Sequence, residues 1–188
     1  KTVIDFFKLQ ADIIKKYRRK DQFITTNGLF NFIDYHRLAD EVLDFHCYDN
    51  YPNFAYDLRN GKENSNGMMD RNSSYKLSLV RSISNPFGIM EQQSGGGGWN
   101  FRMLQPMPKP GQMRLWTMQA VAHGADFISF FRWRTCRFGT EMYWHGINDP
   151  SNKQNRRLEE LRSINKDRLK ISEIAGSLYQ ADVAIIKD

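Results

Sequence analysis

Strand-like apolar runs and helix-like segments alternate along this chain, and this alternation limits its fold more than any other feature. The apolar runs lie at 23–27, 42–52, 87–93 and 127–131, and each is followed by a segment with helical spacing or helix-capping residues. A strand, a helix and a further strand in this order form a parallel pair with a right-handed crossover. The sequence therefore predicts an α/β fold built on a parallel sheet.

Five helices are expected beside these strands. The first spans 3–17 and leads into the basic run 15–20, as the helix dipole favours. The others are predicted at 34–42, 74–84, 110–124 and 155–174, with Pro110 in a first turn and Gly124 as a C-cap. Gly176 ends the last helix, and a final strand is expected at 181–186. Between them, 53–72 is a long polar loop of the kind found at binding surfaces or in disordered segments.

The number of strand–helix units suggests part of a larger barrel. Four units are half of an eightfold barrel, whose active site is formed by side chains just past the strand ends. A half barrel would leave two long strand edges unpaired. We therefore expect residues 1–176 to be the C-terminal half (strands five to eight) of a (β/α)8 TIM barrel, and 177–188 to begin a further α/β domain. The alternative is an open four- or five-stranded α/β sheet that folds alone, although no dinucleotide or phosphate glycine motif accompanies it.

The composition is that of an ordinary globular protein, with 40% hydrophobic and 26% charged residues among 188. The formal charge of +6 would suit nucleic acid, but the basic residues are scattered and no binding motif is present, which argues against that partner. No apolar run reaches membrane-spanning length and no signal peptide is visible, although the first residue is Lys rather than Met. We expect a cytoplasmic protein that binds neither nucleic acid nor membrane.

The two cysteines, Cys47 and Cys136, lack metal-ligand spacing. They are expected to be free thiols in a reducing compartment. We expect no metal and no cofactor.

Two acidic stretches carry the functional signal. Glu91 lies at the end of the run 87–93, just before the glycines 95–98, and Glu141 follows the run 127–131. Glu91 is either a catalytic carboxylate or a structural one that caps the next helix or pairs with Arg102 or Arg114. The residues alone leave both readings open.

Several short motifs then resemble one known family. They are Met90-Glu91-Gln92-Gln93, Trp99-Asn100, Pro110 to Trp116, Ala120 to Asp126, Phe131-Arg132-Trp133-Arg134, and Glu141 with His145-Gly146. Together with Thr25-Thr26-Asn27 and Asp49 to Pro52, they resemble the β-galactosidases of glycoside hydrolase family 42. The resemblance runs from Lys1 almost to the end of the chain. It implies a retaining glycosidase on a (β/α)8 barrel, acting on a galactoside or oligosaccharide substrate.

The resemblance also implies roles for individual residues. Glu91 matches the nucleophile at the end of strand seven, where hydrogen-bond donors such as Gln92 should keep it ionised. Glu141 matches an acid that binds sugar hydroxyls. His145 follows it by four positions, where three is expected in many members. Trp99 and Phe131 match aromatics around the galactosyl subsite, and Tyr51 is a weaker substrate-binding candidate.

The family carries its acid/base in an Asn-Glu pair on strand four, upstream of Lys1. The chain alone is therefore expected to lack useful glycosidase activity. The resemblance also implies that the complete protein is a homo-oligomer such as a trimer. The alternatives are a retaining glycosidase that acts on arabinopyranosides and a non-catalytic carbohydrate-binding or assembly fragment.

Overall fold

The centre of the molecule is a three-stranded parallel sheet. The computed structural model describes residues 2–52, 69–98, 106–178 and 180–186. The strands follow one another in the order β1 (His46–Asn50), β2 (Phe87–Gln93) and β3 (Phe127–Phe131). Their parallel pairing confirms the α/β class predicted from the alternation of strands and helices.

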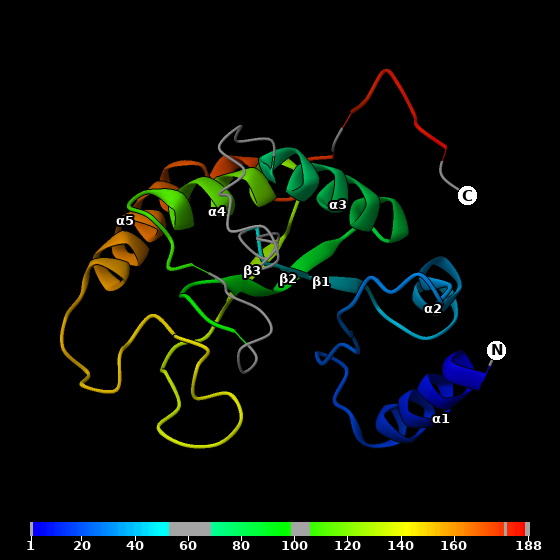
Figure 1. Cartoon of the computed structure of the whole chain (residues 1–188). Coiled ribbons are helices and arrows are strands. Elements are labelled where there is room, and N and C mark those ends of the chain that lie inside the picture. Colours follow the sequence, from blue (N-terminus) through cyan, green and yellow to red (C-terminus); the bar gives the residue numbers. More distant parts are fainter. Residues whose placement is uncertain (1, 53–68, 99–105, 179, 187–188) are drawn as a thin grey trace.

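Helices connect the strands and cover one side of the sheet. The helix α3 (Met69–Ile83) links β1 to β2, α4 (Gln112–Ala122) links β2 to β3, and α5 (Arg156–Lys170) follows β3. These three helices form an arc on the same side of the strands, whereas α1 (Thr2–Tyr17) and α2 (Tyr35–Glu41) lie together beyond the β1 edge (Figure 1). This arrangement leaves the loops that follow the strands to form the site.

The main apolar core lies between the sheet and these helices. Leu77 and Val80 of α3 are fully buried against Phe87 and Ile89 of β2 and Ala120 of α4. Burying one such large side chain contributes about 1.5–3 kcal/mol. Two further clusters join α1 to α2 and α4 to α5. The core thus fixes the positions at which the strands end.

Several helices begin or end directly beside a capping residue. Asp34 caps α2 by accepting a hydrogen bond from the Arg37 amide, and Asn155 caps α5 by accepting one from the Leu158 amide. Gly124 lies just past α4 with a positive φ of 89°, as its predicted capping role requires. Pro110 is not in the first turn of α4, because that helix begins two residues later.

Two helices differ in extent from the prediction. The helix α3 begins at Met69, inside the segment expected to be a polar loop. The helix α5 ends at Lys170 and is followed by a short 3-10 turn, η1 (Ser172–Ile174), before Gly176. These boundaries lie where polar residues give little periodic signal.

The predicted strand at 23–27 is not formed, and only Asn27 makes a bridge, with Cys47. Side chains take the place of a longer ladder. The Asp44 carboxylate accepts a hydrogen bond from the Ile24 amide at 2.6 Å, and the Thr25 hydroxyl donates to the Phe45 carbonyl at 2.8 Å. The next predicted strand, 42–52, is also shorter than expected, because 42–45 form the turn and bend that follow α2, and β1 ends at Asn50.

The predicted last strand at 181–186 is wrong as well. The structure has no strand there, and Val183, Ile185 and Ile186 are 79%, 89% and 96% exposed. A strand needs a neighbour to pair with, and the described part of the chain places none beside this segment. The division at residue 176 and the closure of an eight-stranded barrel stay predictions.

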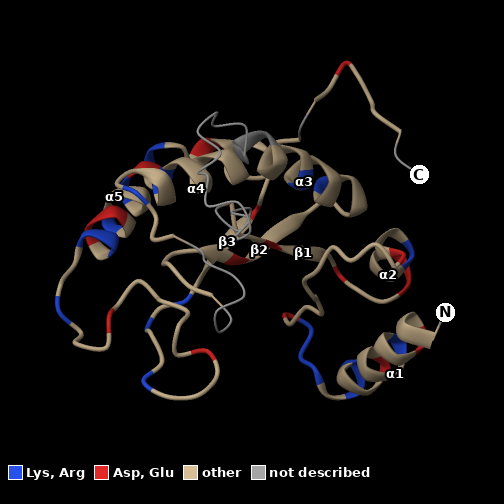
Figure 2. Ribbon diagram, in the orientation of Figure 1, with Lys and Arg blue, Asp and Glu red and all other residues tan. Residues whose placement is uncertain are grey.

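Charges are mixed along the outer helices (Figure 2). On α5, Arg156 pairs with Glu160, and Arg162 pairs with Glu159. No helix in the described ranges is both long and apolar enough to cross a membrane.

Candidate active site

The site begins with Glu91, near the carboxyl end of β2. In the ladder between β1 and β2, Glu91 lies opposite Asp49, so Tyr51, just past β1, lies beside the Glu91 carboxylate. The Tyr51 hydroxyl donates a hydrogen bond to Glu91 Oε2 at 2.7 Å. Burial raises the pKa of Tyr51, and the hydrogen bond to Glu91 and the charges of Glu91, Asp49 and Glu141 raise it further. Tyr51 therefore stays protonated and remains a donor.

The Gln92 side chain makes no hydrogen bond to the Glu91 carboxylate in the described part of the chain, contrary to the prediction. Adjacent residues of a strand point to opposite faces, so Gln92 turns away from the carboxylate. Its Oε1 accepts a hydrogen bond from Asn50 Nδ2 at 2.9 Å, and Asn50 Oδ1 accepts one from the Ser73 hydroxyl at 2.9 Å. This buried network ties β1 and β2 to α3, and the hydrogen bond to Glu91 comes from Tyr51 rather than from Gln92.

The alternative pairing of Glu91 with Arg114 is also absent. Arg114 projects from α4 and pairs with Asp167 of α5 at 2.6 Å. The other arginine considered, Arg102, lies outside the described residues.

Aromatic rings surround the Tyr51 phenol. The Tyr51 ring stands edge-on to Phe131 at 6.4 Å and to Trp144 at 5.7 Å between centroids. Phe131 is the last residue of β3, and its predicted contact with the sugar stays a prediction. Trp144, only 5% exposed, was not predicted, although its place between Glu141 and His145 was a usable signal. Trp99 lies outside the described residues.

The glycine segment after β2 packs tightly rather than forming an open loop. A Cβ atom on Gly97 would lie 2.6 Å from the Trp144 ring, and one on Gly95 would overlap the His145 backbone. The His145 amide donates a hydrogen bond to the Gly96 carbonyl at 2.8 Å. Glycines are therefore needed here, because the backbone of this segment lies close to the Trp144 ring and the His145 backbone. The close packing keeps the Trp144 ring on the side of Tyr51.

Glu141 reaches the same region from the loop after β3. Its carboxylate pairs with Arg132 at 2.9 Å, and its charge contributes to the raised pKa of Tyr51. No hydrogen bond joins the side chains of Glu141 and His145 in the described part of the chain. The backbone amide of His145 makes its described contact at the site. The sugar-binding role predicted for its side chain stays a prediction.

Asp49 is a further acid that the sequence reasoning missed. Its Oδ2 accepts a hydrogen bond from Asn27 Nδ2 at 2.5 Å, whereas its buried Oδ1 has no partner within the described ranges. Burial raises the pKa of Asp49 to about 6; the Asn27 hydrogen bond lowers it, and the Glu91 charge raises it. Its position at the carboxyl end of a predicted strand was the signal that could have identified it.

Other features lie apart from this cluster. A cavity of about 630 Å³ between α4, β3 and α5 contains none of the site residues. Cys47 is buried and Cys136 half-buried, and both are free. The residues that the structure describes contain no group of three or more His, Cys, Asp or Glu arranged to hold a metal ion.

A parallel α/β sheet that gathers carboxylates, a phenol and aromatic rings at the carboxyl ends of its strands defines the class of α/β glycoside hydrolases. A family model described as beta-galactosidase, that of glycoside hydrolase family 42, matches residues 1–171. The chain therefore belongs to glycoside hydrolase family 42.

Individual relatives agree with this assignment. The chain is 36% identical over 196 residues to the beta-galactosidase BgaA of Clostridium cellulovorans, covering 98% of this chain and 27% of the relative. Its fold is similar to that of a catalytic mutant of Gan42B, a GH42 beta-galactosidase from G. stearothermophilus, with a TM-score of 0.82 and 27% identity over 98% of this chain and 27% of the other.

A beta-galactosidase from the haloarchaeon Halorubrum lacusprofundi matches with a TM-score of 0.78 and 30% identity, over 90% of this chain and 26% of the other. The chain thus spans about a quarter of the length of the proteins that it matches.

Proposed function

We propose that this chain forms part of the catalytic domain of a retaining β-galactosidase, with Glu91 as its nucleophile. The hydrogen bond from Tyr51 to Glu91 Oε2 is the observation that carries the proposal. It orients a half-buried carboxylate near the carboxyl end of a parallel strand. The match to the beta-galactosidase family over 1–171 gives further support.

The reaction proceeds in two displacements. Glu91 attacks the anomeric carbon of a terminal β-D-galactose, the bond to the leaving oxygen breaks, and an acid/base group protonates that oxygen. Water, deprotonated by the same group, then attacks the anomeric carbon and releases galactose and the Glu91 carboxylate. Tyr51 holds Oε2 throughout, so Oε1 is the attacking oxygen. We place the acid/base group in a barrel strand upstream of Lys1.

The sugar is held by the groups around this carboxylate. The exposed Glu141 carboxylate accepts hydrogen bonds from sugar hydroxyls, and Phe131 packs against the apolar face of the ring. Trp99 and His145 are assigned to the same subsite on the resemblance alone. A carboxylate that accepts hydrogen bonds from hydroxyls can distinguish sugars by the configuration of those hydroxyls. We propose that it favours galactose, whose hydroxyl at C4 is axial.

The test is covalent trapping in the complete protein. A 2-fluorogalactoside that carries a good leaving group should label Glu91, and peptide mass spectrometry should locate the label there. Glu91→Gln should abolish labelling and lower kcat by more than about 1000-fold. Glu141→Gln is the matched control, because it changes the second carboxylate and should still be labelled, only more slowly. Labelling at another residue, or none in the wild type, overturns the assignment.

Two alternatives respond differently to the same reagents. A related enzyme that prefers arabinopyranosides would be labelled at Glu91 but would have a higher kcat/KM for that sugar, which lacks the C6 group. A non-catalytic carbohydrate-binding or assembly fragment would bind galactose without labelling.

For location and assembly, we propose a cytoplasmic enzyme that forms homo-oligomers, with a trimer as the state to be tested. The two free cysteines are compatible with a reducing compartment. Size-exclusion chromatography with light scattering would measure the subunit number.

A further inference from the structure

Arg132 is fixed at the end of β3 and reaches into the site. Its carbonyl accepts a hydrogen bond from the Ile147 amide at 2.7 Å, which holds its backbone. Its guanidinium carbon lies 4.8 Å from the centre of the Phe131 ring, a cation–π distance. The side chain is 16% exposed, so its direction is set by its neighbours rather than by solvent.

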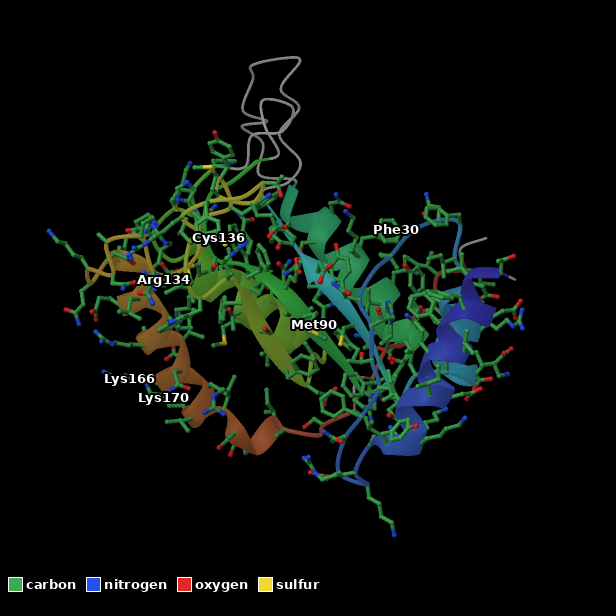
Figure 3. The ribbon with its side chains drawn as sticks, turned by 90° about the horizontal axis from the view of Figure 1, so that it is seen from below. Phe30, Met90, Arg134, Cys136, Lys166 and Lys170 are labelled. Carbon is green, nitrogen blue, oxygen red and sulfur yellow. The ribbon has the colours of Figure 1, made fainter. Side chains whose placement is uncertain are left out.

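The Arg132 guanidinium holds one oxygen of Glu141. Arg132 Nη2 donates to Glu141 Oε2 at 2.9 Å, and Nη1 lies 3.5 Å from the same oxygen. Nη1 also donates to the sulfur of Cys136 at 2.8 Å, and Cys136 lies in the loop beyond β3 (Figure 3). Three residues of one loop are thus joined through Arg132.

The other oxygen of Glu141 remains available. No residue within the described ranges bonds Glu141 Oε1, and the side chain is 51% exposed. A half-exposed carboxylate on a loop would otherwise rotate, because an exposed ion pair alone fixes a side chain weakly. Here the partner is itself packed on Phe131 and held by Cys136, so the carboxylate has a defined direction.

We infer that Arg132 is a positioning residue for sugar selectivity: it binds Glu141 Oε2 and thereby directs Oε1 toward the sugar hydroxyls. The inference rests on the proposed function of Glu141. Arg132 does not touch the reacting atoms and acts only through Glu141. Its effect should therefore disappear when Glu141 can no longer act as a carboxylate.

The experiment compares four forms of the complete protein: wild type, Arg132→Gln, Glu141→Gln and the double variant. Each is assayed on nitrophenyl β-galactoside and β-glucoside, which differ in the configuration of the C4 hydroxyl. We expect Arg132→Gln to lower kcat/KM for the galactoside about 10- to 100-fold, mostly through a higher KM. The ratio of kcat/KM for the galactoside to kcat/KM for the glucoside should fall at least 5-fold. The double variant should lie within about 2-fold of Glu141→Gln.

Controls separate positioning from a general loss of structure. Arg162→Gln removes an ion pair with Glu159 on the outer helix α5 and should leave both substrates unchanged. Arg132→Lys keeps the charge but not the two-donor fork, and should show an intermediate selectivity ratio. If Arg132→Gln does not fold, Arg132→Lys provides the same comparison.

Two results would overturn the inference: a selectivity ratio that stays constant in the Arg132 variants, or losses that multiply in the double variant. Labelling of wild-type Glu91 by the fluorinated galactoside would show in either case that the proposed function stands. Absence of that label would point to failure of the proposed function instead.

Discussion

At the scale of single residues, the phenol of Tyr51 is the contact that most directly tests the mechanism. Tyr51→Phe keeps the ring between Phe131 and Trp144 but removes the donor to Glu91. A hydrogen bond to a charged group contributes about 1.5–3 kcal/mol, so kcat/KM should fall about 10- to 100-fold in the complete enzyme. The melting temperature should change by only a few degrees. Wild-type activity in this variant would contradict the assigned role.

Asp49 gives a pH-dependent prediction at the same scale. Its pKa is raised in the folded protein to about 6 from an ordinary 3.8, so the native state binds more protons than the unfolded state between these values. The contribution of Asp49 to stability is therefore present below about pH 4 and lost as pH rises through about 6. Asp49→Asn cannot ionise and should be free of this loss.

The measurement is urea unfolding of wild type and Asp49→Asn at pH 4 and pH 8. The stability of the variant is compared with that of wild type at each pH. This difference should favour the variant by about 1–2 kcal/mol more at pH 8 than at pH 4, a value already reduced for the partial exposure of Asp49. A stability difference that does not change between the two pH values would show that Asp49 does not titrate as described.

The sequence predicted the site residues unevenly. The structure brings Glu91, Phe131 and Tyr51 together at or just past strand ends, whereas their functional roles come from the family resemblance and stay predictions. Asp49 also lies at a strand end and was missed; that it stands beside Glu91 depends on the register between β1 and β2. Interstrand register is a property of the assembled sheet that local patterns do not contain.

At the scale of elements, the glycine segment after β2 shapes the aromatic wall. Gly97→Ala should push the Trp144 ring away from Tyr51, because the new Cβ would lie 2.6 Å from that ring. We expect a loss of activity of at least 10-fold and a destabilisation of about 1–3 kcal/mol, as for overpacked cores. Gly111→Ala is the control, since its Cβ meets nothing within 4 Å and only the positive φ of 84° is penalised.

Steady-state kinetics and thermal unfolding check this comparison. Gly111→Ala should lose about 1 kcal/mol of stability with kcat/KM unchanged. Equal activity losses in the two variants would show that the glycine segment does not act through Trp144.

The ends of helices could be predicted from the sequence where a capping residue lies beside them. Asp34, Asn155 and Gly124 mark helix ends, and all three appear in the structure as caps or just past them. The apolar runs at 23–27 and 181–186 form no strands, because an apolar run indicates only a preference for extended backbone. The second run has no partner in the described part of the chain, whereas the first lies beside β1 but pairs with it through one bridge, Asn27 to Cys47. In the first case Asp44 and Thr25 supply side-chain bonds instead.

At the scale of the whole molecule, the chain covers about a quarter of its relatives, and the acid/base is proposed to lie upstream of Lys1. The 188-residue polypeptide should therefore hydrolyse nitrophenyl β-galactoside at least 1000-fold more slowly than the complete protein, because the leaving oxygen receives no proton. Initial rates at matched concentrations check this. Comparable turnover would show that the acid/base lies within the chain.

The strand β3 has a further consequence for handling the isolated polypeptide. Phe127–Phe131 is an uncharged, aromatic-rich segment without proline, and its outer edge has no strand partner in the described part of the chain. Such segments assemble into cross-β fibrils when strands of separate copies pair. Charged residues at the ends of such a segment, here Asp126 and Arg132, oppose that assembly in general. We therefore expect Arg132→Gln, which removes one of the two flanking charges, to make the isolated polypeptide more prone to aggregation.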